Sequence, residues 1–239
     1  MKKRPRSYFA LSLSIVVLFL SGCAPTVSEP PKQAIIQNVN KSEDQEIVTL
    51  SLEAKTVSIP IHKIDPLNDY LNQVDQTERE IELERIRTDA FTSKSGDIYG
   101  DIRYACGVKL CDHALVQIKN DQIRTIPLYS GSIFMQHIFS PDENYMAILL
   151  GRNEAAEIVR NNVVVIRTEP FSFAEFQYSS ELAGKLTASE FTIPIVSLNW
   201  VNDATLKAGI PDTTDYSFET LAEWNQHGSK TKEVILTVK

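Results

Sequence analysis

The spacing of apolar residues predicts a chain that is mainly β. From residue 96 onward, most apolar side chains fall in short alternating or fully apolar runs, the pattern of half-buried and buried strands. Polar turns at 119–122 and 140–144 separate neighbouring runs and favour antiparallel hairpins. Short helical segments are indicated at 179–186 and 216–224. The predicted strands span residues 98–104, 114–118, 123–128, 133–139, 145–150, 163–166, 193–200, 206–210 and 234–238.

Residues 47–95 are predicted to form a β-hairpin followed by a helical segment. Apolar residues alternate at 48, 50 and 52 and again at 57, 59 and 61, which indicates two short strands whose apolar residues form two separate faces. Pro60 has no backbone N–H, so the second strand should lie at a sheet edge or end there. A helix should begin at Asp65-Pro66, because Asp is a favoured N-cap and Pro suits the first turn.

A second helix is predicted over about residues 78–91. Thr77 and Glu80 have the spacing of a capping box at its start. Its charged residues, Glu82 among them, should face water. Its apolar side would be formed by Ile81, Leu83, Ile86 and Ala90.

The β region contains a weak internal repeat. Phe139-Ser140-Pro141-Asp142, followed by Tyr145 and Ala147, aligns with Trp200-Val201-Asn202-Asp203, followed by Leu206 and Ala208, at an offset of 61 residues. Residues 139–150 resemble the strand–turn–strand of β-propeller repeats, with Glu143 in place of their glycine; the second copy lacks Ser-Pro-Asp. Residues 96–239 amount to about three blades of roughly 40–45 residues, whereas closed propellers take four or more. We therefore expect antiparallel meander sheets in an open or two-layer arrangement, propeller-like at most.

The first 22 residues have the composition of a secretory signal. Four basic residues stand within the first six positions, and residues 8–20 form a nearly uninterrupted apolar run. The run has 13 residues, fewer than the roughly 20 that a transmembrane helix needs. Small residues then lead to Cys23.

Leu20-Ser21-Gly22-Cys23 resembles the lipobox of bacterial lipoproteins, in which an aliphatic residue, a small residue and Gly or Ala precede Cys. The resemblance covers the first 23 residues only. It implies cleavage after Gly22, diacylglycerol on the Cys23 sulfur, and an N-terminus carrying fatty chains such as palmitate. Ala24 after the cysteine implies, by the same resemblance, the outer membrane in a host that has two. The alternative is an ordinary signal or an uncleaved anchor with an unrelated cysteine.

Composition restricts the partners. Cleavage before Cys23 removes four basic residues and no acidic one, so the net charge falls from −7 to −11. A surface of that charge disfavours nucleic acid and anionic headgroups, so the lipid on Cys23 must supply the membrane attraction. Residues 23–46, rich in proline and polar residues, are predicted to be a disordered tether.

The densest cluster of reactive residue types lies at 106–113. Cys106 and Cys111, an even pair in an exported chain, are predicted to form a disulfide. A metal site that also uses Asp112 or His113 is the alternative, but no second Cys or His pair supports it. Free thiols are the remaining possibility.

Other candidates are weaker. The histidines at 62, 113, 137 and 227 are far apart in sequence, and no serine lies in a recognisable hydrolase motif. Asp142 with Glu143, and the segment 212–215, are expected to be solvated turns rather than calcium ligands. Several aromatic residues are expected to pack in the core, with the lining of a groove as the alternative. They are Phe171, Phe173, Phe176, Tyr178, Trp200 and Trp224.

The sequence therefore predicts an α+β, mainly β protein in four segments: a signal peptide (1–22), a tether (23–46), a hairpin with helices (47–95) and an antiparallel β domain (96–239). We expect it on the extracytoplasmic face of the cell membrane, held by lipid on Cys23. Its function is predicted to be the binding of an unknown ligand or envelope protein, with no catalytic residue, metal or cofactor assigned. The alternative is a cell-envelope hydrolase whose active site the sequence does not reveal.

Overall fold

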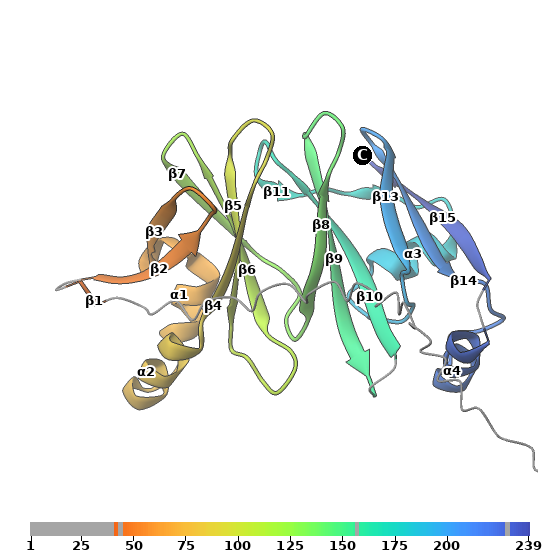
Figure 1. Cartoon of the computed structure of the whole chain (residues 1–239), viewed down its shortest axis with the longest axis horizontal. Coiled ribbons are helices and arrows are strands. Elements are labelled where there is room, and N and C mark those ends of the chain that lie inside the picture. The colour runs from red at the N-terminus through yellow and green to blue at the C-terminus, as the bar shows by residue number, and fades with distance from the viewer. Residues whose placement is uncertain (1–40, 43–44, 156–157, 228–229) are drawn as a thin grey trace, which may run out of the picture. The chain divides into compact units, whose positions relative to one another are not determined.

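A computed structural model describes residues 41–42, 45–155, 158–227 and 230–239. The signal peptide, Cys23 and most of the predicted tether lie outside the described residues. In the part that is described, the protein is mainly β, and its strands form four antiparallel sheets (Figure 1).

The predicted N-terminal hairpin is present. β1 (Lys41–Ser42), β2 (Gln45–Ser51) and β3 (Thr56–Pro60) form the first sheet, with β2 in the middle. β1 and the first two residues of β2 lie inside the stretch predicted to be a disordered tether, so that prediction is wrong for them. Val48 pairs with Ile59, and both are buried in one core, so the two apolar runs share a face instead of forming two. β3 ends at Pro60 on the edge of its sheet, as the missing N–H requires.

Helices follow the hairpin, but the second is shorter than predicted. They are η1 (Ile61–Lys63), α1 (Asp65–Leu71) and α2 (Gln76–Arg85). Asp75, rather than Thr77, caps α2, accepting from the backbone N–H groups of Thr77 and Glu78 at 2.9 Å. The prediction of helix up to residue 91 is wrong, because Ile86 has extended backbone angles and the chain enters β4 (Arg87–Thr92).

Glu82 corrects the predicted solvent face of α2. Its side chain is buried, with 4 % of the residue exposed, whereas Ile81 is 52 % exposed. Arg85 forms an ion pair with Glu82 at 2.5 Å. Burial and the neighbouring Glu82 carboxylate raise the pKa of Tyr70 to about 12. The side of α2 that faces α1 therefore carries the polar side chain of Glu82 and not Ile81.

Each of the remaining sheets contains four strands. The second sheet is built from β4, β5 (Ile98–Tyr104), β6 (Asp112–Lys119) and β7 (Gln122–Pro127). The third is built from β8 (Ile133–Phe139), β9 (Tyr145–Glu154), β10 (Ile158–Arg167) and β11 (Ser172–Phe173). The fourth has the order β12-β15-β14-β13, with β12 (Phe176–Gln177), β13 (Ser197–Asn202), β14 (Thr205–Pro211) and β15 (Thr231–Val238). β4 pairs with β5, so the second sheet spans the boundary expected near residue 96.

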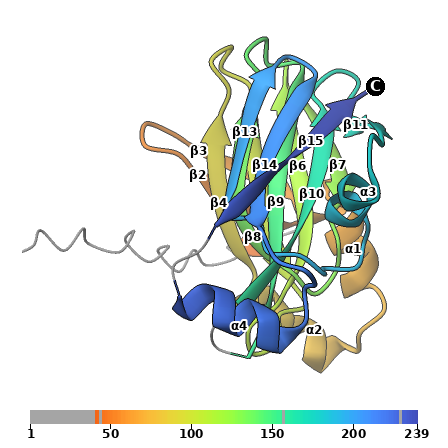
Figure 2. The same cartoon turned by 90° about the vertical axis from the view of Figure 1, so that its right-hand side faces the viewer.

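Two further helices lie beside the last sheets. α3 (Glu181–Thr187) and α4 (Phe218–Gln226) are capped by Ser180 and Ser217, whose hydroxyls accept from backbone N–H groups of the first turn. α3 packs beside β10 and β15, and α4 contacts β10 (Figure 2). In the sequence, α3 lies between β12 and β13, and α4 lies between β14 and β15.

Apolar clusters separate successive sheets. The first lies between the N-terminal hairpin with α1 and the second sheet. Another lies between the second and third sheets, and a further one between the third and fourth. On β9, Met146, Ile148 and Leu150 face one cluster while Ala147 and Leu149 face the next. The continuous apolar runs in the sequence therefore mark strands whose two faces are both buried.

Gly100 on β5 makes room for the hairpin. A Cβ there would lie 2.7 and 2.8 Å from the two terminal carbons of Leu50, which is itself fully buried. We expect Gly100→Ala to lower the free energy of unfolding by about 1–3 kcal/mol through overpacking, measured by denaturant titration. Gly107→Ala, with no close neighbour, is the control and should change stability by less than about 0.5 kcal/mol. Equal effects of the two substitutions would contradict this packing.

Candidate functional site

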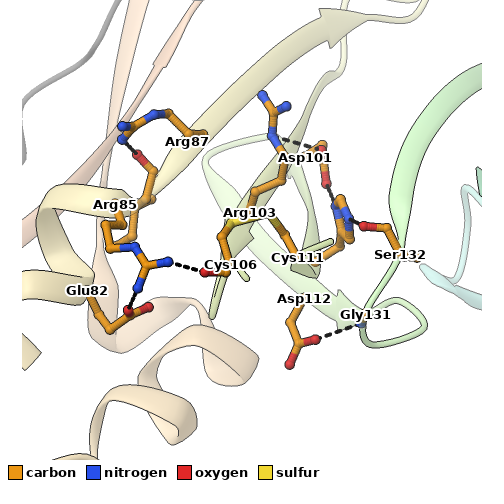
Figure 3. The surroundings of a disulfide bond; sticks show 12 residues. Glu82, Arg85, Arg87, Asp101, Arg103, Cys106, Cys111, Asp112, Gly131 and Ser132 are labelled. Carbon is orange, nitrogen blue, oxygen red and sulfur yellow. Dashed lines mark hydrogen bonds and ion pairs between the residues drawn. A yellow bond between two sulfur atoms is a disulfide. The ribbon is translucent and has the colours of Figure 1, made fainter. Parts of the chain in front are cut away.

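The predicted disulfide is confirmed. Cys106 and Cys111 are bonded and close a tight loop in which the Gly107 N–H donates to the Leu110 carbonyl at 2.9 Å. Cys111 also exchanges two backbone hydrogen bonds with Ser132, at 3.1 and 2.9 Å. Arg85 of α2 donates to the Cys106 carbonyl (Figure 3). The loop is thus held by α2 and by the start of β8, and the bonded sulfurs are not available as thiolate ligands.

His113 and Asp101 form a buried pair beside this loop. His113 Nδ1 lies 2.8 Å from Asp101 Oδ1, and His113 Nε2 lies 3.0 Å from the Ser132 carbonyl oxygen. An ionised Asp101 and the Ser132 carbonyl both accept hydrogen bonds, an arrangement that favours the doubly protonated, cationic form of the ring. Burial alone would lower the pKa of His113, but Asp101 and the Ser132 carbonyl outweigh it and the net shift is upward.

The pair connects two sheets. Asp101 and His113 are on the faces of β5 and β6 that also carry Tyr99 and Leu115, which pack against the third sheet. Ser132 immediately precedes β8 of that sheet (Figure 3). Asp101 and His113 are each 1 % exposed, so no substrate reaches them without a rearrangement. The geometry is that of a structural ion pair.

The disulfide takes away the two thiolates on which the alternative metal site depended. Among the described residues, no group of three His, Cys, Asp or Glu side chains is arranged to hold a metal ion. Asp112, the candidate next to Cys111, accepts from the Gly131 N–H at 2.9 Å. It therefore orders the turn that precedes β8.

Asp142 and Glu143 tie neighbouring turns together. Partial desolvation alone would raise the pKa of Asp142. Hydrogen bonds from Ser140 and Asn144 outweigh it and hold the pKa below its usual value. Glu143 has a left-handed φ of 59°, and its carboxylate accepts from the backbone of Lys94 and Ser95 at 2.9 and 3.3 Å. These bonds join the β8–β9 turn to the β4–β5 turn. They explain why a glutamate occupies a position that favours glycine.

The remaining histidines lie on different elements. His62 is in η1, and His227 follows α4. His137 on β8 stacks on Phe91 with ring centroids 3.6 Å apart, and burial lowers its pKa. The described structure brings none of these together with His113 and Asp101 in a solvent-accessible site.

The predicted aromatic group divides between core and surface. Phe171 and Phe176 pack in the apolar clusters, as does Trp200, whose Nε1 donates to the Ile138 carbonyl at 3.0 Å. The Trp224 ring nitrogen donates to the Lys230 carbonyl at 2.7 Å. Phe173 and Tyr178, 45 % and 59 % exposed, line a cavity of about 390 Å³ beside β10.

A larger cavity, of about 720 Å³, lies between α3 and the loop that joins β14 to α4. Its volume is in the range of small-molecule sites. Five separate segments line it: β10, α3, the linker at 191–193, the loop at 213–216 and β15. Sequence reasoning treated 212–215 as an ordinary loop and left 171–190 largely unassigned, so this cavity was missed. No spacing pattern in the sequence indicates it, because the five segments meet only through sheet packing.

Arg160 fixes two walls of this cavity, which we call the α3 cavity. One guanidinium nitrogen, Nη1, donates to the carbonyls of both Thr192 and Tyr216, the latter at 2.8 Å. Glu154 pairs with the same guanidinium. Asp215 orders the adjoining loop by accepting from the Ser217 hydroxyl and N–H at 2.6 and 2.9 Å, and these bonds lower the pKa of Asp215 to about 2.

No helix in the described residues is long and apolar enough to cross a membrane. Comparison of the chain with protein-family models, with curated proteins and with solved structures gave no match.

Proposed function

We propose that this protein is a lipid-anchored lipoprotein on the extracytoplasmic face of the cell envelope, and that its β domain binds a ligand or partner there without catalysing a reaction. The anchor is inferred from Leu20-Ser21-Gly22-Cys23 at the end of the apolar run. In a host with two membranes, Ala24 favours the outer one. An acidic body with two or three acyl chains stays at the bilayer because one chain binds marginally and two bind stably.

One contrast carries the binding role. The hydrogen-bonded His113–Asp101 pair is sealed, whereas the α3 cavity opens to solvent and is lined without a histidine. A hydrolase that uses a histidine and a carboxylate needs both in reach of the substrate. The two carboxylates that line the α3 cavity, Glu181 and Asp215, are held by Lys185 and Ser217. A cavity of mixed polar and apolar lining is suited to holding a ligand.

We further propose that the three four-stranded sheets act as propeller-like blades. The repeated turns support this: the Asp142 N–H donates to Asp203 Oδ1 at 3.1 Å, so the equivalent turns of the third and fourth sheets touch. Such stacking offers a rigid body from which the cavity loops project.

Crosslinking in intact envelopes followed by mass spectrometry tests the proposed function. The anchored protein is expected to capture a defined envelope component, and Cys23→Ala is expected to lose it with the membrane location. Release of fragments from isolated envelope material by the purified protein would contradict the non-enzymatic role and favour the hydrolase alternative.

A further inference from the structure

The α3 cavity is richer in cations than the rest of this acidic protein. The chain has 31 acidic and 24 basic residues, yet the cavity lining holds three cations, Arg160, Lys185 and Lys232, and two carboxylates, Glu181 and Asp215. Local charge at a cavity mouth affects which ligands enter. Arg160 and Lys232 also pair with carboxylates outside the lining, Glu154 and Asp212, so a ligand anion can be bound only by a cation whose ion pair is weak.

Both lining carboxylates already have partners. Glu181 pairs with Lys185 at 2.7 Å on the same helix. Asp215 is held by the two hydrogen bonds from Ser217. The ion pair of Lys232 in the described structure is with neither of them but with Asp212, outside the lining.

Lys232 on β15 is held more loosely. Its nearest approach to Asp212 is 3.6 Å, and its ammonium group lies 3.3 Å from the Thr213 carbonyl. The same group lies 5.7 Å from the centre of the Tyr216 ring. Thr213 and Tyr216 both line the cavity, so these contacts place the ammonium group at its wall, where a stronger acceptor would compete for it.

The lining also contains unsatisfied hydroxyls and an apolar surface. The buried Thr192 and Tyr216 hydroxyl oxygens have no hydrogen-bond partner within the described structure. A buried polar group without a partner costs free energy, but these oxygen atoms are covered, so the cavity wall would have to rearrange for a ligand to contact them. Phe191 and Ile193 supply the apolar part of the wall.

We propose that the α3 cavity binds a small organic anion, a carboxylate or phosphate monoester, with its charged group at Lys232 and its apolar part against Phe191 and Ile193. This inference rests on the proposed binding function and names its ligand class. Arg160 is a positioning residue here, because its hydrogen bonds hold the two loops that form the wall.

The test is a titration of the full-length, ¹⁵N-labelled lipoprotein in micelles, followed by NMR. Benzoate and phenyl phosphate are the anionic probes; benzamide and benzylamine are neutral and cationic compounds of similar size. At least one anion should shift the amide signals of Ile193 and Tyr216 saturably. The neutral and cationic compounds should bind at least about tenfold more weakly, because they lack a charge-assisted contact with Lys232.

Lys232→Gln should weaken anion binding by about tenfold or more. Lys207→Gln is the matched control: Lys207 lies on the same sheet, pairs with Glu233 at 2.9 Å and does not line the cavity. A dispersed spectrum of each variant confirms that it is folded, and unchanged affinity in Lys232→Gln would overturn the proposal.

Two other results would overturn it in different ways. Binding of benzamide or benzylamine as tight as that of the anions would refute the ligand class and leave the binding function standing. No saturable shift at Ile193 or Tyr216 with any probe would refute the α3 cavity as this site. The envelope crosslinking experiment then decides the proposed function independently.

Discussion

Asp101→Asn is expected to lower the free energy of unfolding by about 3–5 kcal/mol, the usual cost of removing one partner from a buried ion pair. The substitution keeps the shape of the side chain and removes the charge that stabilises the His113 imidazolium, 2.8 Å away. Denaturant titration measures the effect. Both the second and the third sheet should become less stable, because the pair joins them through the Ser132 carbonyl.

Glu233→Gln is the matched control for this prediction. It also removes a carboxylate from an ion pair, with Lys207 at 2.9 Å, but the Glu233 side chain is 64 % exposed. Exposed ion pairs contribute at most about 1 kcal/mol, so the control should be nearly neutral. Similar losses in the two variants would show that the buried pair has no special role.

The same pair predicts a pH dependence. Because folding raises the pKa of His113, the stabilisation is fully present below the unfolded-state pKa, about 6.5, and is lost as pH rises through the folded-state pKa. His137 has the opposite sign: burial lowers its pKa, so its contribution is lost as pH falls. Thermal unfolding measured over a series of pH values checks this. The melting temperature of the wild type should fall as pH rises through the folded-state pKa of His113, and this fall should be smaller in Asp101→Asn.

Cys23→Ala is expected to abolish membrane retention of the mature protein. Each buried methylene contributes about 0.8 kcal/mol, so removing the acylated sulfur removes the whole attraction of an otherwise acidic body. Fractionation of cells should find the variant in the soluble extracytoplasmic fraction or as an unprocessed precursor.

Ser21→Ala is the control for the anchor, since a small residue remains at that position of the lipobox. It should be processed and retained like the wild type. A Cys23→Ala protein that is cleaved and yet stays in the membrane fraction would show that another feature holds it there.

Local patterns were sufficient for much of the fold. The alternation at 98–104 and 133–139 matches β5 and β8 residue for residue, because hairpins with polar turns are decided by neighbours in the chain. β11 and β12 were not predicted, since two residues carry no periodicity. The end of α2 was misplaced because pairing of residues 87–92 with β5 overrides the helical tendency of the segment.

The sites were harder to predict. The disulfide followed from the count and spacing of cysteines in an exported chain. His113 was considered as a ligand, but its partner Asp101 was not, although a carboxylate in the middle of an apolar strand is a sign of a buried polar contact. The α3 cavity combines side chains from residues 160 to 232, and their proximity depends on how the third and fourth sheets pack.

Intact-mass analysis of the native protein extracted from membranes tests the central claim most directly. The lipoprotein assignment predicts a chain that begins at Cys23, with the mass of residues 23–239 less two hydrogens for the Cys106–Cys111 bond, plus a diacylglyceryl group. A mature chain that begins at another residue, or begins at Cys23 without fatty chains, would contradict it.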